Sequence, residues 1–467
     1  MTTSKVTSIF RLFKQAIKGE QQDYTKLSID RAIFLLSIPM ILEMIMESLF
    51  AVVDVYWVSQ LNDNDAVATV GLTESLLTII YSIGIGLSMG ATAMVARRVG
   101  EKDIKSAQLA AMQSIYFGIG ISIVITFIGI FFSESLLRWM GASQSLIDNH
   151  SGYTKWMLTG NLTILMLFLI NAIFRGAGDA SLAMRSLWVA NILNIALGPI
   201  FIFGVGPIPR LGVEGAAIAT TIGRGCGVLF QLYYLLSGKG VIKINLKSLA
   251  IRWDIIIRLF KVSAGGTGQF LIASASWIFL VRILSTFGST AVAGYTIAIR
   301  LIVFAILPAW GMANAAATLV GQNLGAGFPD RAEKSVWRAA FLNMIFLGIV
   351  TIIFLLFARP LLQLFTDDVN VLQNGILALQ VICLGYIFYA YGMVISQSFN
   401  GAGDTRTPTL INFFGFWLFQ IPLAYSLAIL AGVGTTGVYA AISIAESAIA
   451  VVGIIIFRKG AWKAVKI

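Results

Sequence analysis

The hexapeptide FRGAGD at residues 174–179 returns as FNGAGD at residues 399–404, which is 225 positions further along a chain of 467 residues. Shorter matches at the same offset are Ala66-Val67-Ala68 with Ala291-Val292-Ala293, Gly100 with Gly325, Leu136-Leu137 with Leu361-Leu362, and Gly212-Val213 with Gly437-Val438. Agreement at one ungapped offset over most of each half indicates a duplication. The sequence therefore predicts two tandem copies of one architecture.

The composition excludes a water-soluble globule. Hydrophobic residues make up 58% of the chain, charged residues only 12%, and the mean hydropathy is +0.85. At about 20 apolar residues for each spanning helix, the chain has room for about a dozen helices and no sizeable soluble domain. The apolar runs predict twelve transmembrane helices at 31–58, 66–96, 107–133, 152–175, 181–205, 212–237, 255–286, 291–321, 332–357, 373–400, 407–431 and 434–457.

The basic residues predict the orientation of these helices. Loops rich in Lys and Arg stay in the cytoplasm, and alternate connections, counted with both termini, hold 26 of the 33 basic residues. Both termini are therefore expected on the cytoplasmic side of the inner (plasma) membrane. The net charge of +11 is then a topology signal and predicts no nucleic-acid partner.

An even number of spans in each half means that both halves enter the membrane in the same direction. Parallel repeats of this kind hold a substrate between the halves, near the middle of the bilayer. The expected organisation is a cytoplasmic amphipathic segment, an N-lobe of helices 1–6, a cytoplasmic linker, a C-lobe of helices 7–12 and a basic tail, at 1–30, 31–237, 238–254, 255–457 and 458–467. The first segment shows no signal-peptide pattern and is expected either to lie on the lipid surface or to form a partly disordered tail.

Three carboxylates lie along one face of the first predicted helix. Glu43, Glu47 and Asp54 are 4 and 7 residues apart, which places them within about 40° of one another on a helical wheel. Glu74 enters from the outer end of the second helix. Charges inside a membrane are costly and usually face a protein-lined cavity. We expect these groups either to bind protons or a cation there or to form structural hydrogen bonds with neighbouring helices.

The second half lacks acids at the equivalent positions, where it has Gly268, Ile272, Phe279 and Ile299. Its charged residues within spans are Arg282, Arg300 and Glu446, so ion coupling is assigned to the first lobe. Arg300 either pairs with a carboxylate or contacts substrate. The residues expected to line a substrate cleft, with core or lipid-facing positions as the alternative for the aromatic ones, are Gln269, Phe270, Trp277, Phe304 and Arg300.

Motifs for other chemistries are missing from the sequence. No Gly-x-x-x-x-Gly-Lys-Ser/Thr segment occurs, and the single histidine, His150, belongs to no metal-ligand pattern. We therefore expect neither an enzyme nor a receptor, no cofactor and no ATP-binding subunit. A proton or sodium gradient is expected to drive transport.

The sequence resembles the multidrug and toxic compound extrusion (MATE) family over about residues 31–457. The resemblance is carried by Pro39 and Val52-Val53-Asp54, by Ala66-Val67-Ala68 and Gly71, by Asn191-x-x-Asn194 with Gly198-Pro199, and by the paired Gly-Ala-Gly-Asp turns. It implies a V-shaped protein of twelve helices that acts as a monomer and exports small organic cations in exchange for protons or sodium. A lipid or lipid-linked oligosaccharide flippase of the same superfamily is the alternative.

The resemblance also implies roles for individual residues. Asp54 matches the family's cation-coupling aspartate, and Asn194 matches a polar partner of it, so a sodium ion near these two is one expectation. Many relatives carry an acid four residues after this asparagine, where this chain has Gly198. Proton coupling, with Glu43 and Glu47 supplying the missing charge, is the preferred interpretation.

Overall fold

The computed structural model describes residues 2–61, 63–244 and 250–467, so that part of the predicted linker lies outside the described residues. The first half, preceded by α1 (Thr2–Lys18), contains α2 (Ile29–Ser59), α3 (Asn64–Gly100), α4 (Ile104–Trp139), α5 (Gln144–Thr159), α6 (Asn161–Ala177), α7 (Ala180–Phe203) and α8 (Val213–Ser237). The second half contains α9 (Trp253–Ser285), α10 (Ser289–Gly325), α11 (Pro329–Gln363), α12 (Val369–Cys383), α13 (Tyr386–Ala402), α14 (Arg406–Asn412), α15 (Ile421–Tyr425) and α16 (Thr435–Arg458). Two π-helical segments, Phe413–Gln420 and Ser426–Leu430, join α14 to α15 and extend α15 toward α16.

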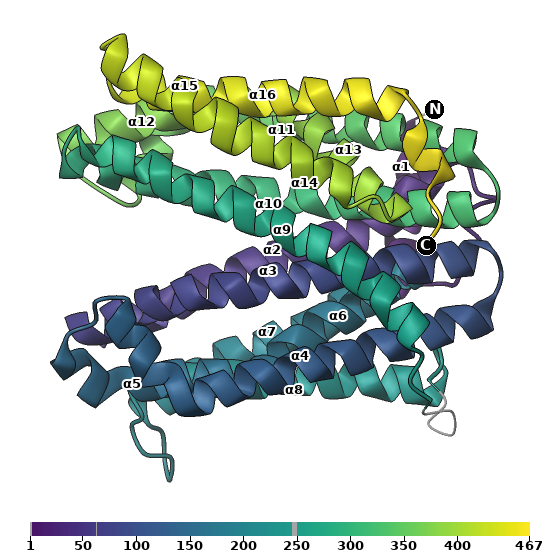
Figure 1. The fold of residues 1–467 in the computed structure, drawn as a ribbon, viewed down its shortest axis with the longest axis horizontal. Helices are drawn as coiled ribbons and strands as arrows, with labels where there is room; N and C mark the ends of the chain where they lie inside the picture. The colour runs from purple at the N-terminus through teal and green to yellow at the C-terminus, as the bar shows by residue number, and fades with distance from the viewer. Residues whose placement is uncertain (1, 62, 245–249) are drawn as a thin grey trace.

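The predicted twelve-span layout fits these helices. Ten described helical stretches are long and apolar enough to cross a bilayer, and α12 with α13 forms an eleventh that is bent by 59°. The remaining membrane-length helix is α8, whose hydropathy is lowered by Glu214 and Arg224 and which packs along α7. Figure 1 shows most of them running roughly parallel as two stacked layers, one from each half of the chain, while α9 crosses obliquely from the upper layer to the lower one.

Two spans that the sequence predicts as continuous are interrupted in the structure. In the fourth span a single residue, Gly160, separates α5 from α6, and the two continue as one span of 34 residues. The tenth bends by 59° next to Gly385, between α12 and α13. A Cβ atom on Gly160 would lie 2.6 Å from the Thr221 hydroxyl, and one on Gly385 would lie 2.7 Å from the Ser443 hydroxyl. These two glycines are themselves 225 residues apart, so the duplication includes the break.

The Gly-Ala-Gly-Asp turns end α6 and α13. Gly178 and Gly403 both have φ of 90°, the left-handed conformation in which glycine commonly terminates a helix. The following aspartates differ in what they bind. Asp179 accepts a hydrogen bond from the backbone N–H of Val241 at 2.7 Å, whereas Asp404 accepts from the N–H of Thr407 at 3.1 Å.

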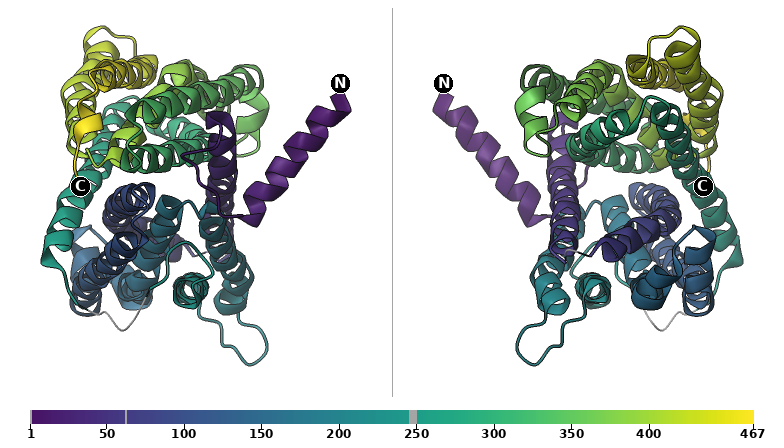
Figure 2. Two further views of the ribbon diagram at one scale, coloured as in Figure 1. Left: turned by 90° about the vertical axis from the view of Figure 1, so that its right-hand side faces the viewer. Right: turned by 90° about the vertical axis from the view of Figure 1, so that its left-hand side faces the viewer.

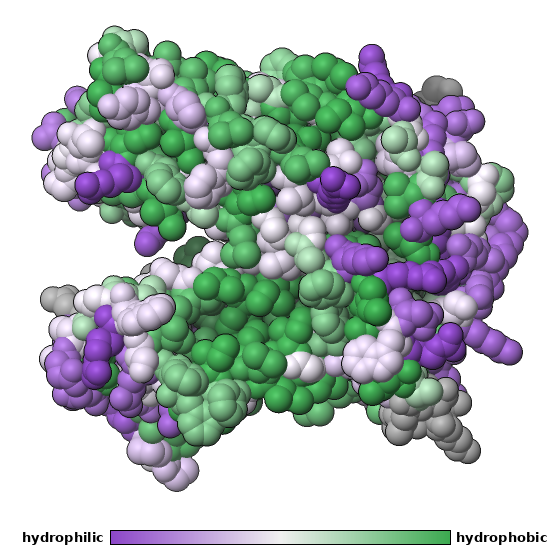
Figure 3. Space-filling model, viewed as in Figure 1, coloured by the Kyte–Doolittle hydropathy of each residue, from purple (hydrophilic) through white to green (hydrophobic). Residues whose placement is uncertain are grey.

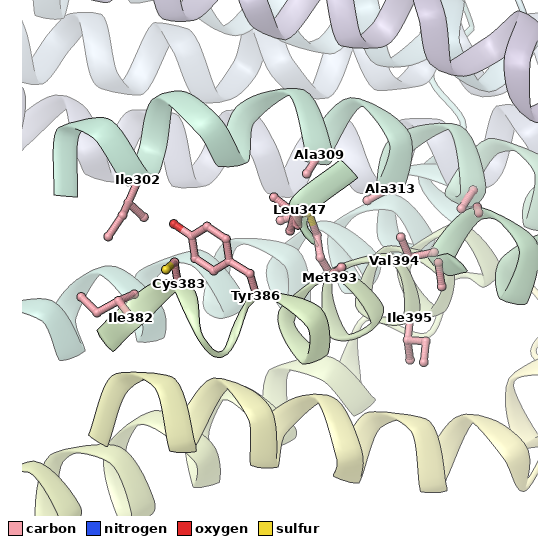
Figure 4. Close-up of a cluster of buried hydrophobic side chains, with 14 of the residues drawn as sticks. Ile302, Ala309, Ala313, Leu347, Ile382, Cys383, Tyr386, Met393, Val394 and Ile395 are labelled. Carbon is pink, nitrogen blue, oxygen red and sulfur yellow. The ribbon is translucent and has the colours of Figure 1, made fainter. Parts of the chain in front are cut away.

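Each layer has its own hydrophobic core. Figure 4 shows part of the core of the second layer, where Leu347, Tyr386 and Met393 are buried between α10, α11 and α13. In the first layer, side chains such as Leu165 and Phe174 of α6 pack against α3 and α4. The layers contact each other mainly through α3 with α9 and α2 with α10.

The layers are close together at one end and separated at the other. Figure 3 shows a wedge-shaped opening between them at the end opposite the two chain termini, while hydrophilic surface covers the closed end. At the closed end a Cβ atom on Gly100 would lie 2.0 Å from the carbonyl oxygen of Gln322, and one on Gly325 would lie 2.1 Å from that of Arg97. The cleft therefore opens away from the basic loops. Figure 2 shows α1 projecting from this body.

Candidate functional site

The acidic stripe of α2 points into the first layer. Helix α2 is apolar apart from a few polar side chains and packs against α7 and α10. Its carboxylates at Glu43 and Glu47 find partners on α6, α7 and α8, as described below. The predicted common face of these side chains is thus directed at protein, but their surroundings differ.

Glu43 is held in a buried ion pair. Its carboxylate is 2% exposed and accepts hydrogen bonds from the Arg175 guanidinium at 2.6 Å and from the Asn171 amide at 3.0 Å. Asn171 in turn accepts from Ser186 and Gln231. This network joins α2, α6, α7 and α8 through fully buried groups, which is the arrangement expected of a structural connection.

Glu47 lies one turn further along α2 in a looser setting. Its carboxylate is 22% exposed, accepts a hydrogen bond from Asn191 at 3.0 Å, and lies 3.6 Å from the Arg224 guanidinium. Arg224 itself is 2% exposed. The pair combines a partly hydrated carboxylate with a deeply buried cation.

Asp54 is the acid of this stripe that has no direct partner in the described part of the chain, where it forms no hydrogen bond and no ion pair within 4 Å. Its side chain is partly buried. The charges of Arg224 and Glu74 act on it from a greater distance. Because its oxygens are not used by the fold, Asp54 is available to bind an incoming ion.

Glu74 and Arg300 come from different layers. Glu74 lies on α3, Arg300 lies on α10, and both side chains are exposed. Their charges interact, although they do not form an ion pair within 4 Å. They therefore place opposite charges on the two sides of the interface between the layers.

Asn194 forms no hydrogen bond with Asp54 in the described structure. Its amide is buried and donates to the hydroxyl of Thr220 at 2.8 Å. At Gly198, one turn further along α7, a Cβ atom would meet Cδ1 of Trp57 at 3.5 Å. The indole of Trp57 thus lies where an acidic side chain would project from α7.

The predicted cleft residues of the second layer are in different environments. Gln269 is 5% exposed and is engaged in a reciprocal amide pair with Asn400, at 2.9 and 3.2 Å. Asn400 is the repeat equivalent of Arg175. The second half therefore has a neutral amide pair at this residue where the first half has an ion pair. Phe270 is partly buried and packs edge-on against Trp310 at 6.1 Å between ring centroids. Trp277 and Phe304 are 42% and 50% exposed.

The sequence alone did not reveal the partners of the acidic stripe. Arg175 looks like a turn residue because it begins the Gly-Ala-Gly-Asp motif, and Arg224 looks like an isolated basic residue in a span. Tyr81 and Tyr153 also lie near the acids, since the charge of Asp54 acts on both. The partners could have been inferred from the two arginines in apolar helices, because each buried arginine requires a buried acidic partner.

Two halves of similar architecture around a cleft, with carboxylates buried in one of them, are typical of a helical membrane transporter. The MatE family model matches residues 39–200 and 267–426, one stretch in each half. This chain belongs to the multidrug and toxic compound extrusion (MATE) family, as its motifs predict.

Relatives and solved structures agree with this assignment. The probable multidrug resistance protein NorM of Thermotoga maritima is 26% identical over 419 residues, which cover 89% of this chain and 88% of that protein. The probable multidrug resistance protein YoeA of Bacillus subtilis is 24% identical over 87% of this chain and 89% of its own. The solved structure of a multidrug resistance MATE family transporter in an outward-facing conformation superimposes with a TM-score of 0.89 at 28% identity. The match covers 96% of this chain and 100% of the other.

Proposed function

We propose that this protein is a secondary-active multidrug efflux antiporter. It exports small organic cations in exchange for protons or sodium, and it works as a monomer in the plasma membrane with both termini in the cytoplasm. The observation that supports this most directly is Asp54, a partly buried carboxylate at membrane depth whose oxygens the described fold leaves unpaired. The names of the multidrug resistance relatives support the class of substrate.

The proposed cycle couples Asp54 to the cleft between the layers. With the cleft open to the outside, an external cation or proton loads the Asp54 carboxylate. Loading changes the charge of the first layer and lowers the affinity for the positively charged substrate, which leaves through the open end. Closure of that end and opening of the other then reset the site. This is alternating access by movement of two rigid repeats.

Substrate recognition is assigned to the surfaces that face the cleft. Aromatic faces attract cations, and exposed aromatic side chains such as Trp277 and Phe304 are available on α9 and α10. The carboxylate of Glu74 supplies negative charge on the first layer, and Arg300 supplies positive charge on the second. Gln269, which is buried in its pair with Asn400, is expected to support α9 and not to touch substrate.

The test is export by purified protein in vesicles. A fluorescent organic cation is loaded, a pH gradient or a sodium gradient is imposed separately, and its release is followed. We expect Asp54→Asn to reduce gradient-driven release to the level of vesicles that contain no protein, because an amide cannot carry the coupling charge. Asp367→Asn, which alters an exposed loop carboxylate, is the matched control and should retain full release. Export by Asp54→Asn at the wild-type rate would remove the proposed role.

A further inference from the structure

Arg224 has an unusual position for a charged side chain. It lies in the middle of α8 with 2% of its surface exposed. Its guanidinium carbon is 5.6 Å from the centre of the Phe50 ring and 5.7 Å from that of the Tyr81 ring. An ionised group at membrane depth is costly and marks a functional position. The proposed cycle, as described so far, gives Arg224 no role.

The guanidinium of Arg224 is only loosely bound. Its Nη2 atom lies 3.6 Å from the Glu47 carboxylate and donates a long hydrogen bond of 3.4 Å to the Tyr81 hydroxyl. Its Nε and Nη1 atoms are buried and have no hydrogen-bond partner among the described residues. Its charge also acts on Asp54. The cation therefore lies beside the Glu47 carboxylate, its charge reaches Asp54, and most of its hydrogen-bonding capacity is unused.

The other buried arginine of this layer shows what a structural pair looks like. Arg175 contacts the Glu43 carboxylate at 2.6 Å, and Asn171 completes that site. A short, hydrogen-bonded pair of this kind keeps one geometry. The longer separation between Arg224 and Glu47 lacks this constraint, so Arg224 is able to act on both carboxylates of its site.

With Arg224 in place, the residues around Asp54 leave few oxygen atoms free to bind a sodium ion. Like other hard cations, sodium binds through several oxygen atoms, yet Asn194 already binds Thr220 at 2.8 Å, and the Trp57 indole covers Gly198. Across the part of the chain that the structure describes, no group of three His, Cys, Asp or Glu side chains is placed to hold a metal ion. A positive charge is already present in the form of Arg224.

We infer that Arg224 is the ion-selectivity residue of the coupling site: its guanidinium is the resident cation of Glu47 and Asp54 and keeps sodium out. A metal ion would have to enter beside this fixed charge and find oxygen ligands there, whereas a proton needs neither space nor a coordination shell. This inference rests on the proposed antiport function, and it specifies that function by leaving the proton as the coupling ion.

The experiment measures sodium binding without transport. Melting temperatures of purified wild type, Arg224→Gln and Arg224→Lys are recorded against sodium chloride, with potassium chloride keeping the ionic strength constant. A ligand that binds the folded state raises its melting temperature. We expect no sodium-specific shift in wild type or Arg224→Lys. In Arg224→Gln the Glu47 carboxylate is freed and an amide oxygen is added, so we expect a rise of about 1–3 °C. Arg282→Gln, at an exposed arginine in the second layer, is the matched control and should not shift.

The outcomes separate this inference from the proposed function. A sodium-specific rise in the wild-type protein, or none in Arg224→Gln, would overturn the selectivity role. If Arg224→Gln does not fold, the double variant Glu47→Gln/Arg224→Gln removes both partners together and leaves Asp54 without a nearby guanidinium. It should show a smaller sodium-specific rise, because one carboxylate of the site is lost as well. Because no transport is needed, a failure of export in vesicles would count against the proposed function alone.

Discussion

Glu43 and Glu47 show how much the surroundings of one residue decide its role. Both lie on the same face of α2, and the sequence predicts similar functions for them. In the structure Glu43 is enclosed with Arg175, whereas Glu47 is partly hydrated. A helical wheel identifies the face but not the partners, because Arg175 and Arg224 lie on α6 and α8, far away in the sequence.

Substitution of Glu43 should therefore act on stability. Glu43→Gln leaves the Arg175 charge buried without a counter-charge, and breaking a buried pair in this way costs about 3–5 kcal/mol. We expect a clearly lower melting temperature in detergent and, per folded molecule, export close to that of wild type. Asp367→Asn, at an exposed loop carboxylate, should leave the melting temperature unchanged. Loss of export by well-folded Glu43→Gln would instead place Glu43 in the coupling reaction.

At the scale of the element, the turn at Asp179 connects the helices of the first layer to the linker. Asp179 is 5% exposed, and burial raises its pKa to about 6, although the hydrogen bond from the backbone of Val241 opposes this shift. In the unfolded chain its pKa is near the ordinary value of 3.8. The folded state thus binds this proton more tightly than the unfolded state does.

This difference predicts the sign of a pH effect. Protonated Asp179 adds about 3 kcal/mol to the free energy of unfolding. This contribution is fully present below about pH 4 and is lost as the pH rises through about 6. Asp179→Asn cannot ionise, so its melting temperature should fall less steeply than that of wild type between these pH values. Equal slopes for the two proteins, measured by thermal unfolding across this range, would show that Asp179 does not titrate in this way.

The breaks at Gly160 and Gly385 show the limits of prediction for an element. Apolar runs are long enough to predict two continuous spans, and nothing in hydropathy alone places a bend within them. At both glycines the chain lies close to a later helix of the same half, α8 at Gly160 and α16 at Gly385. The repeat offset does connect the two glycines, so the symmetry of the break was present in the sequence even though its existence was not predicted.

At the scale of the whole molecule, the duplication predicts the two layers and the position of the cleft, while the closed end depends on contacts between the layers. There Gly100 faces the Gln322 carbonyl and Gly325 faces the Arg97 carbonyl. These are equivalent pairs, because both glycines and both partners are related by the offset of 225 residues. The sequence shows that the glycines match, but only the fold shows that each approaches the other layer.

A larger side chain at either glycine should hold the closed end apart. Gly325→Val places atoms against backbone that cannot move aside easily, and overpacking of this kind costs about 1–3 kcal/mol. We expect slower export and, from distances between spin labels on α3 and α10, a population with the closed end separated. Gly348→Val, at a glycine on α11 with open space around it, should match wild type. Unchanged distances in Gly325→Val would exclude this crossing as a gate.

The central claim is that loading Asp54 displaces the exported cation, and competition at equilibrium tests it most directly. Binding of a fluorescent organic cation to purified protein is measured while the pH is lowered. By linkage, an ion whose binding lowers the affinity for substrate is itself bound less tightly when substrate is present. The account predicts that acidification weakens binding to wild type and leaves binding to Asp54→Asn unchanged. An equal loss of affinity in both proteins would contradict it.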